Sequence, residues 1–251
     1  FDCEFLYLTL TELFNNLEEI SEEQVESTLI KFKLNPQNIL IDKKDLIGSI
    51  KLYYALKKLC KFYNLEGFAI RCWPELKNNL YNYNMTPCFA LAALMSEGIV
   101  GACESDISST ITMMILNKLS ENHPVVLDYN TFNLDRNSIS LWHCGANSFK
   151  LAENVESIKL RYPTNGGLKE LNSGMAVEFF IKKGNATVAK LDRTYKKMLI
   201  TEGSFIRPIP VYRGGIAELK LNILVHNFLK RTIEEGFEHH VCLVHGNFKK
   251  E

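Results

Sequence analysis

The stretch Ile99-Val100-Gly101-Ala102-Cys103-Glu104-Ser105-Asp106, followed by a helix-like run to Leu119, decides the fold. A short apolar run that ends in polar residues and continues into a helical pattern is typical of a βα unit in a parallel sheet. Ser105 and Asp106 can cap the helix that follows. Glu104 then lies at the carboxyl end of the predicted strand, where ligands gather in α/β sheets.

The same alternation extends along the chain on both sides of this stretch. Apolar strand-like runs and helical runs alternate at 67–72, 87–97, 99–103, 106–119 and 125–128. Such alternation predicts βαβ units and a parallel sheet whose strands are buried on both faces. Upstream, the spacing of apolar residues predicts two amphipathic helices between Glu4 and Lys33 and a longer helix from Asp45 to Asn64.

Beyond about Lys150 the pattern changes to short strands separated by glycine-containing turns. One helix at 223–235 precedes a last strand at 241–245. We therefore predict an α/β fold in two domains. Residues 1–150 form a parallel-sheet α/β domain that carries the acidic site residues, and residues 151–251 form a smaller antiparallel β-barrel-like domain.

Composition narrows the class of protein. The 251 residues are 46% hydrophobic and 23% charged, and the formal net charge is zero. Because the basic residues are scattered, we expect no nucleic-acid partner and no membrane partner. The longest apolar run, Met85 to Met95, is too short to span a bilayer. The seven cysteines show no C-x-x-C pair and lie mostly in apolar stretches, which indicates reduced thiols in a cytoplasmic protein.

The ends of the chain suggest that it is part of a longer polypeptide. It begins at Phe1-Asp2-Cys3 without a methionine, and it stops at Glu251 soon after a strand-like apolar run. We therefore expect a missing domain, and this piece alone can be folded without being active.

Glu104 and Asp128 are the strongest pair of candidate site residues. Each ends an apolar run, where a carboxylate has no packing role and costs several kcal/mol if it is buried unpaired. Two carboxylates at strand ends favour the binding of a hard divalent metal ion. They can also accept and donate protons during a reaction. The alternative is structural, because either carboxylate can cap a helix or a turn.

Histidines supply the remaining candidate ligands. His143 lies at a strand end before Cys144-Gly145, where a structural hydrogen-bonding role competes with metal ligation. His239 and His240 begin the last strand, and alternation sends their rings to opposite faces. Only one of these two histidines can therefore face a given site.

Two further kinds of residue have competing interpretations. Trp73, before Pro74, can form a wall against a sugar ring or belong to the core. For Cys103 and Cys144 we expect packing, because no cysteine–histidine relay or zinc spacing accompanies them.

Taken in order, several motifs resemble one enzyme family. They are Arg71-Cys72-Trp73-Pro74, Pro87-Cys88, the segment 97–107, Asp128, His143-Cys144-Gly145 and Gly236-Phe237-Glu238-His239-His240. Over residues 45–247 this ordered set resembles the L-fucose/L-arabinose isomerase family, most closely its fucose isomerase-like members. One departure is Gly246-Asn247, where such members tend to have Gly-Asp.

The resemblance implies a metal-dependent aldose–ketose isomerase that moves a proton through an enediol or enediolate. It implies that Glu104 and Asp128 bind Mn²⁺ and shuttle protons, without deciding which is the base. One of His239 and His240 matches a metal ligand, and His143 matches a ligand in the arabinose branch. Mg²⁺ or Co²⁺ are the alternative metals.

The same resemblance implies a monosaccharide substrate and a homo-oligomer, a trimer or hexamer, for the full-length protein. It places the missing domain before Phe1. Two alternatives stay open, namely a non-catalytic sugar-binding relative and another metal-dependent carbon-acid enzyme such as an aldolase or an epimerase.

Overall fold

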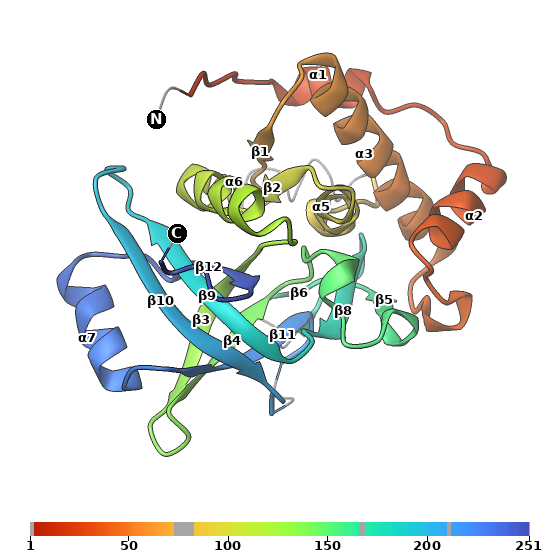
Figure 1. Ribbon diagram of the computed structural model, residues 1–251. Coiled ribbons are helices and arrows are strands. Elements are labelled where there is room, and N and C mark those ends of the chain that lie inside the picture. The colour runs from red at the N-terminus through yellow and green to blue at the C-terminus, as the bar shows by residue number, and fades with distance from the viewer. Residues whose placement is uncertain (1–2, 73–82, 166–168, 210–211, 251) are drawn as a thin grey trace.

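Helices surround a small parallel sheet in the first half of the chain (Figure 1). The computed structural model describes residues 3–72, 83–165, 169–209 and 212–250. Within them, β1 (Gly67–Ala69) pairs in parallel with β2 (Val100–Ala102), and α5 (Pro87–Ser96) lies in the connection. The predicted βαβ unit is therefore present, and β2 delivers the chain to Glu104.

The helices follow from local sequence. They are α1 (Leu10–Asn15), α2 (Glu22–Lys31), α3 (Lys43–Phe62), α5 and α6 (Ile107–Ser120). Ser21 and Gln24 form a reciprocal capping box at the start of α2, as their spacing predicts. Every residue of α5 is buried. Because α5 is apolar on all sides, it forms the centre of the helical half, against α3 and β2.

The large sheet contains strands from both halves of the chain. They are β3 (Val125–Asn133), β4 (Ser138–His143), β5 (Lys159–Arg161), β8 (Ala176–Phe180), β9 (Gly184–Leu191), β10 (Met198–Ile206), β11 (Gly215–Leu221) and β12 (His240–His245). Their order is β10-β9-β12-β3-β4-β11-β8-β5, and β10 also pairs with β11. This extra pairing closes a ring of strands, which takes the place of the barrel-like domain that the sequence predicted.

Shorter elements complete the chain. They are the 3-10 turns η1 (Pro36–Asn38), η2 (Phe149–Leu151) and η3 (Val155–Ser157), the strand pair β6 (Thr164–Asn165) and β7 (Lys169–Glu170), and the helix α7 (Val225–Glu234) between β11 and β12. The final strand and α7 agree with the sequence prediction.

One strand prediction is wrong. The run 125–128 was expected to extend the parallel sheet, but β3 pairs antiparallel with β4 and β12. The reason is that β3 continues to Asn133 and turns back directly into β4, and such a hairpin is antiparallel. A domain boundary at residue 150 would separate β3 and β4 from the strands with which they pair.

The pairing register of the strands in the ring decides which of their residues lie near the small parallel sheet. Asp128 on β3 is the direct partner of His240 on β12. Helix α6 contacts β1 and β2 on one side and β9 and β12 on the other. The loop that carries Glu104 therefore lies beside the middle of β3, at Asp128, and the start of β12, at His240. In the described part of the chain, we find no helix with the length and apolar content needed to cross a membrane.

Candidate active site

The loop between β2 and α6 holds Glu104 in an unusual backbone conformation. Glu104 and Ser105 both have positive φ, 59° and 55°. Non-glycine residues in this region cost about 1–3 kcal/mol each and persist where the surrounding structure fixes them. The N-cap of α6 is Asp106, whose Oδ1 accepts from the backbone N–H of Ser109 at 2.8 Å. Glu104 is therefore not needed as a cap, and its side chain is 42% exposed.

Asp128 lies opposite His240, the first residue of β12, and His239, which precedes that strand. Its Oδ1 is 3.0 Å from Nε2 of His240 and 3.7 Å from Nε2 of His239. The His240 side chain is buried, whereas that of His239 is 65% exposed. The prediction that only one of these histidines can face the site is wrong, because both Nε2 atoms lie beside the same oxygen of Asp128. The reason is that β12 begins at His240, so strand alternation does not extend to His239. His240 is the buried histidine of the two. Its Nε2 is also 3.6 Å from Oε2 of Glu104.

His143, at the end of β4, completes the cluster. The nearest ligand atoms of Glu104, His143 and His240 lie within 4.8 Å of one another, as do those of Asp128, His239 and His240. The two groups share His240. The structure thus brings together all the described site residues that the sequence predicts; Trp73 lies outside the described residues.

Three buried polar atoms in this cluster make no hydrogen bond with the described residues. They are Oδ1 of Asp128, Nε2 of His143 and Nε2 of His240. The 3.0 Å contact between Asp128 and His240 is a charge contact without hydrogen-bond geometry. Buried polar atoms are nearly always satisfied, so these unsatisfied atoms in the two overlapping groups indicate a binding partner beside His240. Carboxylate oxygens and imidazole nitrogens suit a divalent cation such as Mn²⁺.

A second layer of charges, which the sequence reasoning missed, holds His240 in place. Asp106 Oδ2 accepts from Nδ1 of His240 at 2.8 Å and from Nζ of Lys190 at 2.8 Å. Lys190 is fully buried and also lies 3.3 Å from Oε2 of Glu238. Asp106 was interpreted only as a helix cap. The signal for Lys190 was available, because it interrupts the apolar run Val188–Leu191 of β9.

The electrostatics of the cluster follow from burial and from these pairs. Burial by itself would raise the pKa of Asp106 and Asp128, but His240 and the other nearby positive charges lower both. Burial would lower the pKa of His240, yet Asp106 and Asp128 raise it to about 9. His143 has no comparable hydrogen bond to a carboxylate, so burial lowers its pKa. Without a metal, His240 carries the positive charge and His143 is neutral.

The two cysteines beside the cluster are held in the thiol form. The hydrogen bond with Cys72, together with burial, raises the pKa of Cys103 well above its ordinary value. The contact with Cys88, together with burial, does the same for Cys144. Both thiols stay protonated at neutral pH, which supports the packing role expected for them.

Comparison with known proteins identifies similar chains. No family model matches the chain. It is 33% identical over 200 residues to a sulfoquinovose isomerase of Alkalicoccus urumqiensis, which covers 78% of this chain and 43% of the relative. The sulfoquinovose isomerase of Priestia megaterium is 29% identical over 199 residues, covering 76% and 42% of the two chains. That of a Clostridium species is 24% identical over 207 residues, covering 80% and 44%. The chain spans less than half the length of these curated relatives.

These relatives correct one prediction. The assignment to the L-fucose/L-arabinose isomerase family is wrong, because the similar proteins are named sulfoquinovose isomerases. Their names agree with the kind of reaction that was predicted, isomerisation of a sugar. The physical reason for the difference is that carboxylates and histidines at strand ends serve proton transfer in any sugar. Such motifs indicate the reaction more strongly than the substrate.

Proposed function

We propose that this chain carries the proton-transfer site of a metal-dependent aldose–ketose isomerase that acts on sulfoquinovose. The observation that carries the proposal is the set of three unsatisfied buried atoms, on Asp128, His143 and His240, beside the carboxylate of Glu104. The names of the relatives suggest the sugar. The trimer or hexamer stays a prediction.

Two sets of residues that share His240 would each be able to hold the cation, Glu104 with His143 or Asp128 with His239. Mn²⁺ is the best match to their oxygen and nitrogen atoms. When bound, the cation would supply Lewis-acid stabilisation of negative charge on the sugar oxygens. Asp106 holds His240 through Nδ1, so Nε2 of that ring points toward Asp128 and Glu104.

The isomerisation needs a base that removes a proton from the carbon next to the carbonyl, and a group that moves a proton between the two oxygens. Glu104 and Asp128 can divide these tasks, because they approach His240 from different elements, the β2–α6 loop and β3. The low pKa of Asp128 keeps it ionised at neutral pH.

The test uses Glu104→Gln and Asp128→Asn, with Glu153→Gln and Asp135→Asn as matched controls on exposed residues. We expect both site variants to lose at least 100-fold in kcat for isomerisation of sulfoquinovose and the controls to keep it. Circular dichroism checks that each variant folds.

Product analysis defines the reaction. Formation of a ketose from sulfoquinovose supports the proposal, and exchange of one carbon-bound hydrogen with D₂O supports the enediolate route. Turnover at the wild-type rate in either site variant would contradict the proposal. A product with a broken carbon–carbon bond, or an aldose inverted at one carbon, would also contradict it.

A further inference from the structure

We propose that Cys72 and Cys103 form a redox-modification site, at which a hydroperoxide oxidises the two thiols to a disulfide and thereby displaces Glu104. The disulfide is chemistry of this chain alone, whereas its effect on cation binding rests on the proposed function. Cys72 follows β1 and Cys103 follows β2, the two strands that pair in parallel. Both thiols therefore lie at the same edge of the small sheet, next to the candidate active site.

The first observation is the distance between the two sulfurs. Both residues are free thiols, and their Sγ atoms lie 3.6 Å apart in hydrogen-bond contact. A disulfide bond is about 2.05 Å long, so the sulfurs need to approach by only about 1.5 Å. The backbone holds the two strand ends together, because the N–H of Ile70 donates to the backbone oxygen of Ala102 at 3.0 Å. The pair is thus positioned to form a disulfide without rearrangement of the sheet.

The second observation is that the two thiols differ in exposure. Cys72 is half-buried, whereas Cys103 is 1% exposed. The hydrogen bond with Cys103 lowers the pKa of Cys72, although burial and the charge of Glu104 act in the opposite direction. An accessible thiol of this kind beside a second thiol is the arrangement of a peroxide-reactive cysteine and its resolving partner. Cys72 is therefore the thiol that meets the oxidant first.

The oxidation takes place in two steps. The thiolate of Cys72 attacks one oxygen of the hydroperoxide, so that an S–O bond forms, the O–O bond breaks and an alcohol leaves with the proton that Cys72 released. The sulfur of Cys103 then attacks the resulting sulfenic acid; the S–S bond forms, the S–O bond breaks, and hydroxide leaves as water with the proton of Cys103. Together the thiols lose two electrons and two protons, and hydrogen peroxide is reduced to two waters. An external dithiol reverses the reaction by exchange.

The disulfide acts on the candidate active site through the next residue in the chain. Glu104 follows Cys103 directly, and both Glu104 and Ser105 have positive φ. The N–H of Ser105 donates to the backbone oxygen of Ile70 at 3.3 Å, so this loop is attached to the segment that carries Cys72. Because Cys103 is tightly packed, the strained loop takes up part of the movement of the sulfurs. A shift of about 0.5 Å is enough to spoil the geometry of a ligand, so oxidation weakens cation binding by Glu104.

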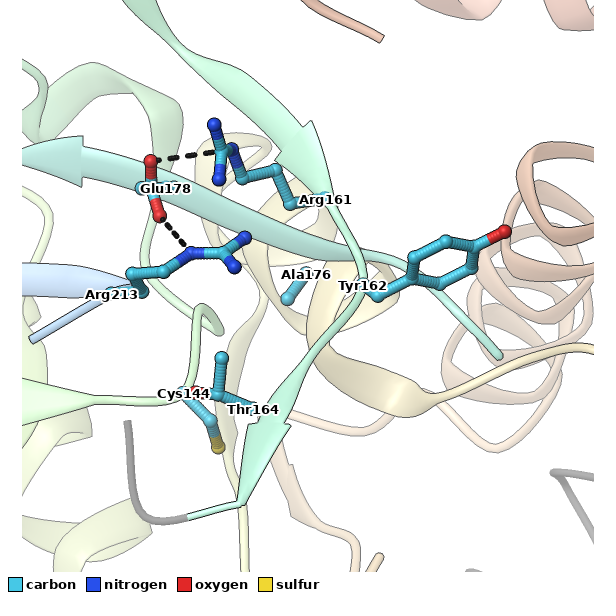
Figure 2. A pocket seen from close by; sticks show the side chains of 8 residues that line it. Cys144, Arg161, Tyr162, Thr164, Ala176, Glu178 and Arg213 are labelled. Atoms are coloured by element: carbon cyan, nitrogen blue, oxygen red, sulfur yellow. Dashed lines mark hydrogen bonds and ion pairs between the residues drawn. The ribbon is translucent and has the colours of Figure 1, made fainter. Parts of the chain in front are cut away.

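A second thiol near the site, Cys144, defines the alternative product. It lines a small pocket in which Arg161 and Arg213 both pair with Glu178 (Figure 2). Its thiol contacts that of Cys88, which is 2% exposed. Because burial keeps an oxidant away from Cys88, the half-buried thiol of the proposed pair reacts before this one. A disulfide between Cys88 and Cys144 is the product that the experiment has to distinguish.

The experiment adds hydrogen peroxide to the reduced, metal-free protein and then removes the excess with catalase. We expect mass spectrometry to show the loss of two hydrogen atoms and a crosslink between the peptides that contain Cys72 and Cys103, which dithiothreitol should reverse. Cys72→Ser and Cys103→Ala should abolish this crosslink. Cys3→Ser is the matched control, because Cys3 is an exposed thiol outside the pair, and it should give the same crosslink as the wild type.

Two further measurements follow the effect on Glu104. Without metal, we expect the amide hydrogen of Ser105 to exchange at least tenfold faster in the disulfide form, because its hydrogen bond to Ile70 is weakened. In calorimetry with Mn²⁺, we expect the disulfide form to bind at least tenfold more weakly than the reduced form. Reduction should restore the affinity, and Cys72→Ser should bind Mn²⁺ equally well before and after treatment with peroxide.

Each outcome supports or overturns the inference. A crosslink between Cys88 and Cys144, or oxidation of Cys72 to a sulfinic acid without a crosslink, would overturn it. A crosslink between Cys72 and Cys103 that leaves both the Ser105 exchange rate and the Mn²⁺ affinity unchanged would overturn the displacement of Glu104. The crosslink with faster exchange, in a protein that binds no Mn²⁺ when reduced, would support the redox site and count against the proposed function. Normal Mn²⁺ binding without any crosslink would do the reverse.

Discussion

The imidazole Nδ1 of His240 lies 2.8 Å from Oδ2 of Asp106, although the two residues are 134 positions apart in the chain. This contact connects the first turn of α6 to the first residue of β12. It leaves Nε2 of His240 as the atom that faces Asp128 and Glu104. The same carboxylate thus caps α6 and positions His240, a proposed metal ligand.

The first prediction concerns pH and the stability of the metal-free protein. The pKa of His240 rises from an ordinary 6.5 to about 9 in the folded state. A group with a raised folded pKa stabilises the protein fully below its unfolded pKa, and this contribution disappears as the pH rises through the folded pKa. We therefore expect the free energy of unfolding, measured with a chelator present, to fall by up to about 3 kcal/mol between pH 6.5 and pH 9.5. His240→Gln should remove this dependence of the free energy of unfolding on pH. An unchanged dependence in the variant would show that another group causes it.

The second prediction concerns the buried lysine. Lys190→Met removes the buried cation that Asp106 and Glu238 share and leaves Asp106 paired with His240 alone, which costs about 3–5 kcal/mol in urea unfolding. Lys118→Met removes a pair with Glu66 in which both side chains are more than half exposed, and it costs at most about 1 kcal/mol. Similar losses in the two variants would mean that the buried network contributes no more than a surface pair.

The third prediction concerns the glycine behind His143. Gly214 has φ of +120°, and a Cβ there would lie 2.4 Å from the backbone oxygen of His143. Gly98 also has positive φ, +92°, but a Cβ there meets nothing within 4 Å. Gly98→Ala therefore measures backbone strain alone, about 1–3 kcal/mol. We expect Gly214→Ala to lower the free energy of unfolding by a further ~2 kcal/mol and to lower kcat/KM, because His143 must move. Equal losses in stability and unchanged kinetics would show that β4 accommodates the methyl group.

The fourth prediction concerns metal binding itself. Adding Mn²⁺ in excess is expected to raise the Tm of the protein, and a chelator should reverse the rise. His143→Gln removes one proposed ligand and should reduce the rise by at least half, whereas His226→Gln, on the exposed side of α7, should leave it intact. Thermal scans at fixed protein concentration measure both. An identical rise in the two variants would exclude His143 as a ligand.

Much of the local structure could be predicted from the sequence. The capping box at Ser21, the long helix 43–62 and the strand–loop–helix at Glu104 all depend on neighbours in the chain. Alternation predicted that only one of His239 and His240 could face the site, which is wrong because both reach Asp128 and β12 begins only at His240. Which of the two is buried depends on the register of β12 against β3, which the sequence does not contain.

The sequence by itself determined the elements and the chemistry of the candidate site, because helix periodicity, caps and carboxylates at strand ends are local properties. Tertiary structure alone decided that β3 leaves the parallel sheet, that Asp106 and buried Lys190 support His240, and that Arg161 and Arg213 share Glu178. The physical reason is that pairing between distant strands and burial of charge are settled by the competition among long-range contacts. No window of the chain contains both partners of such a contact.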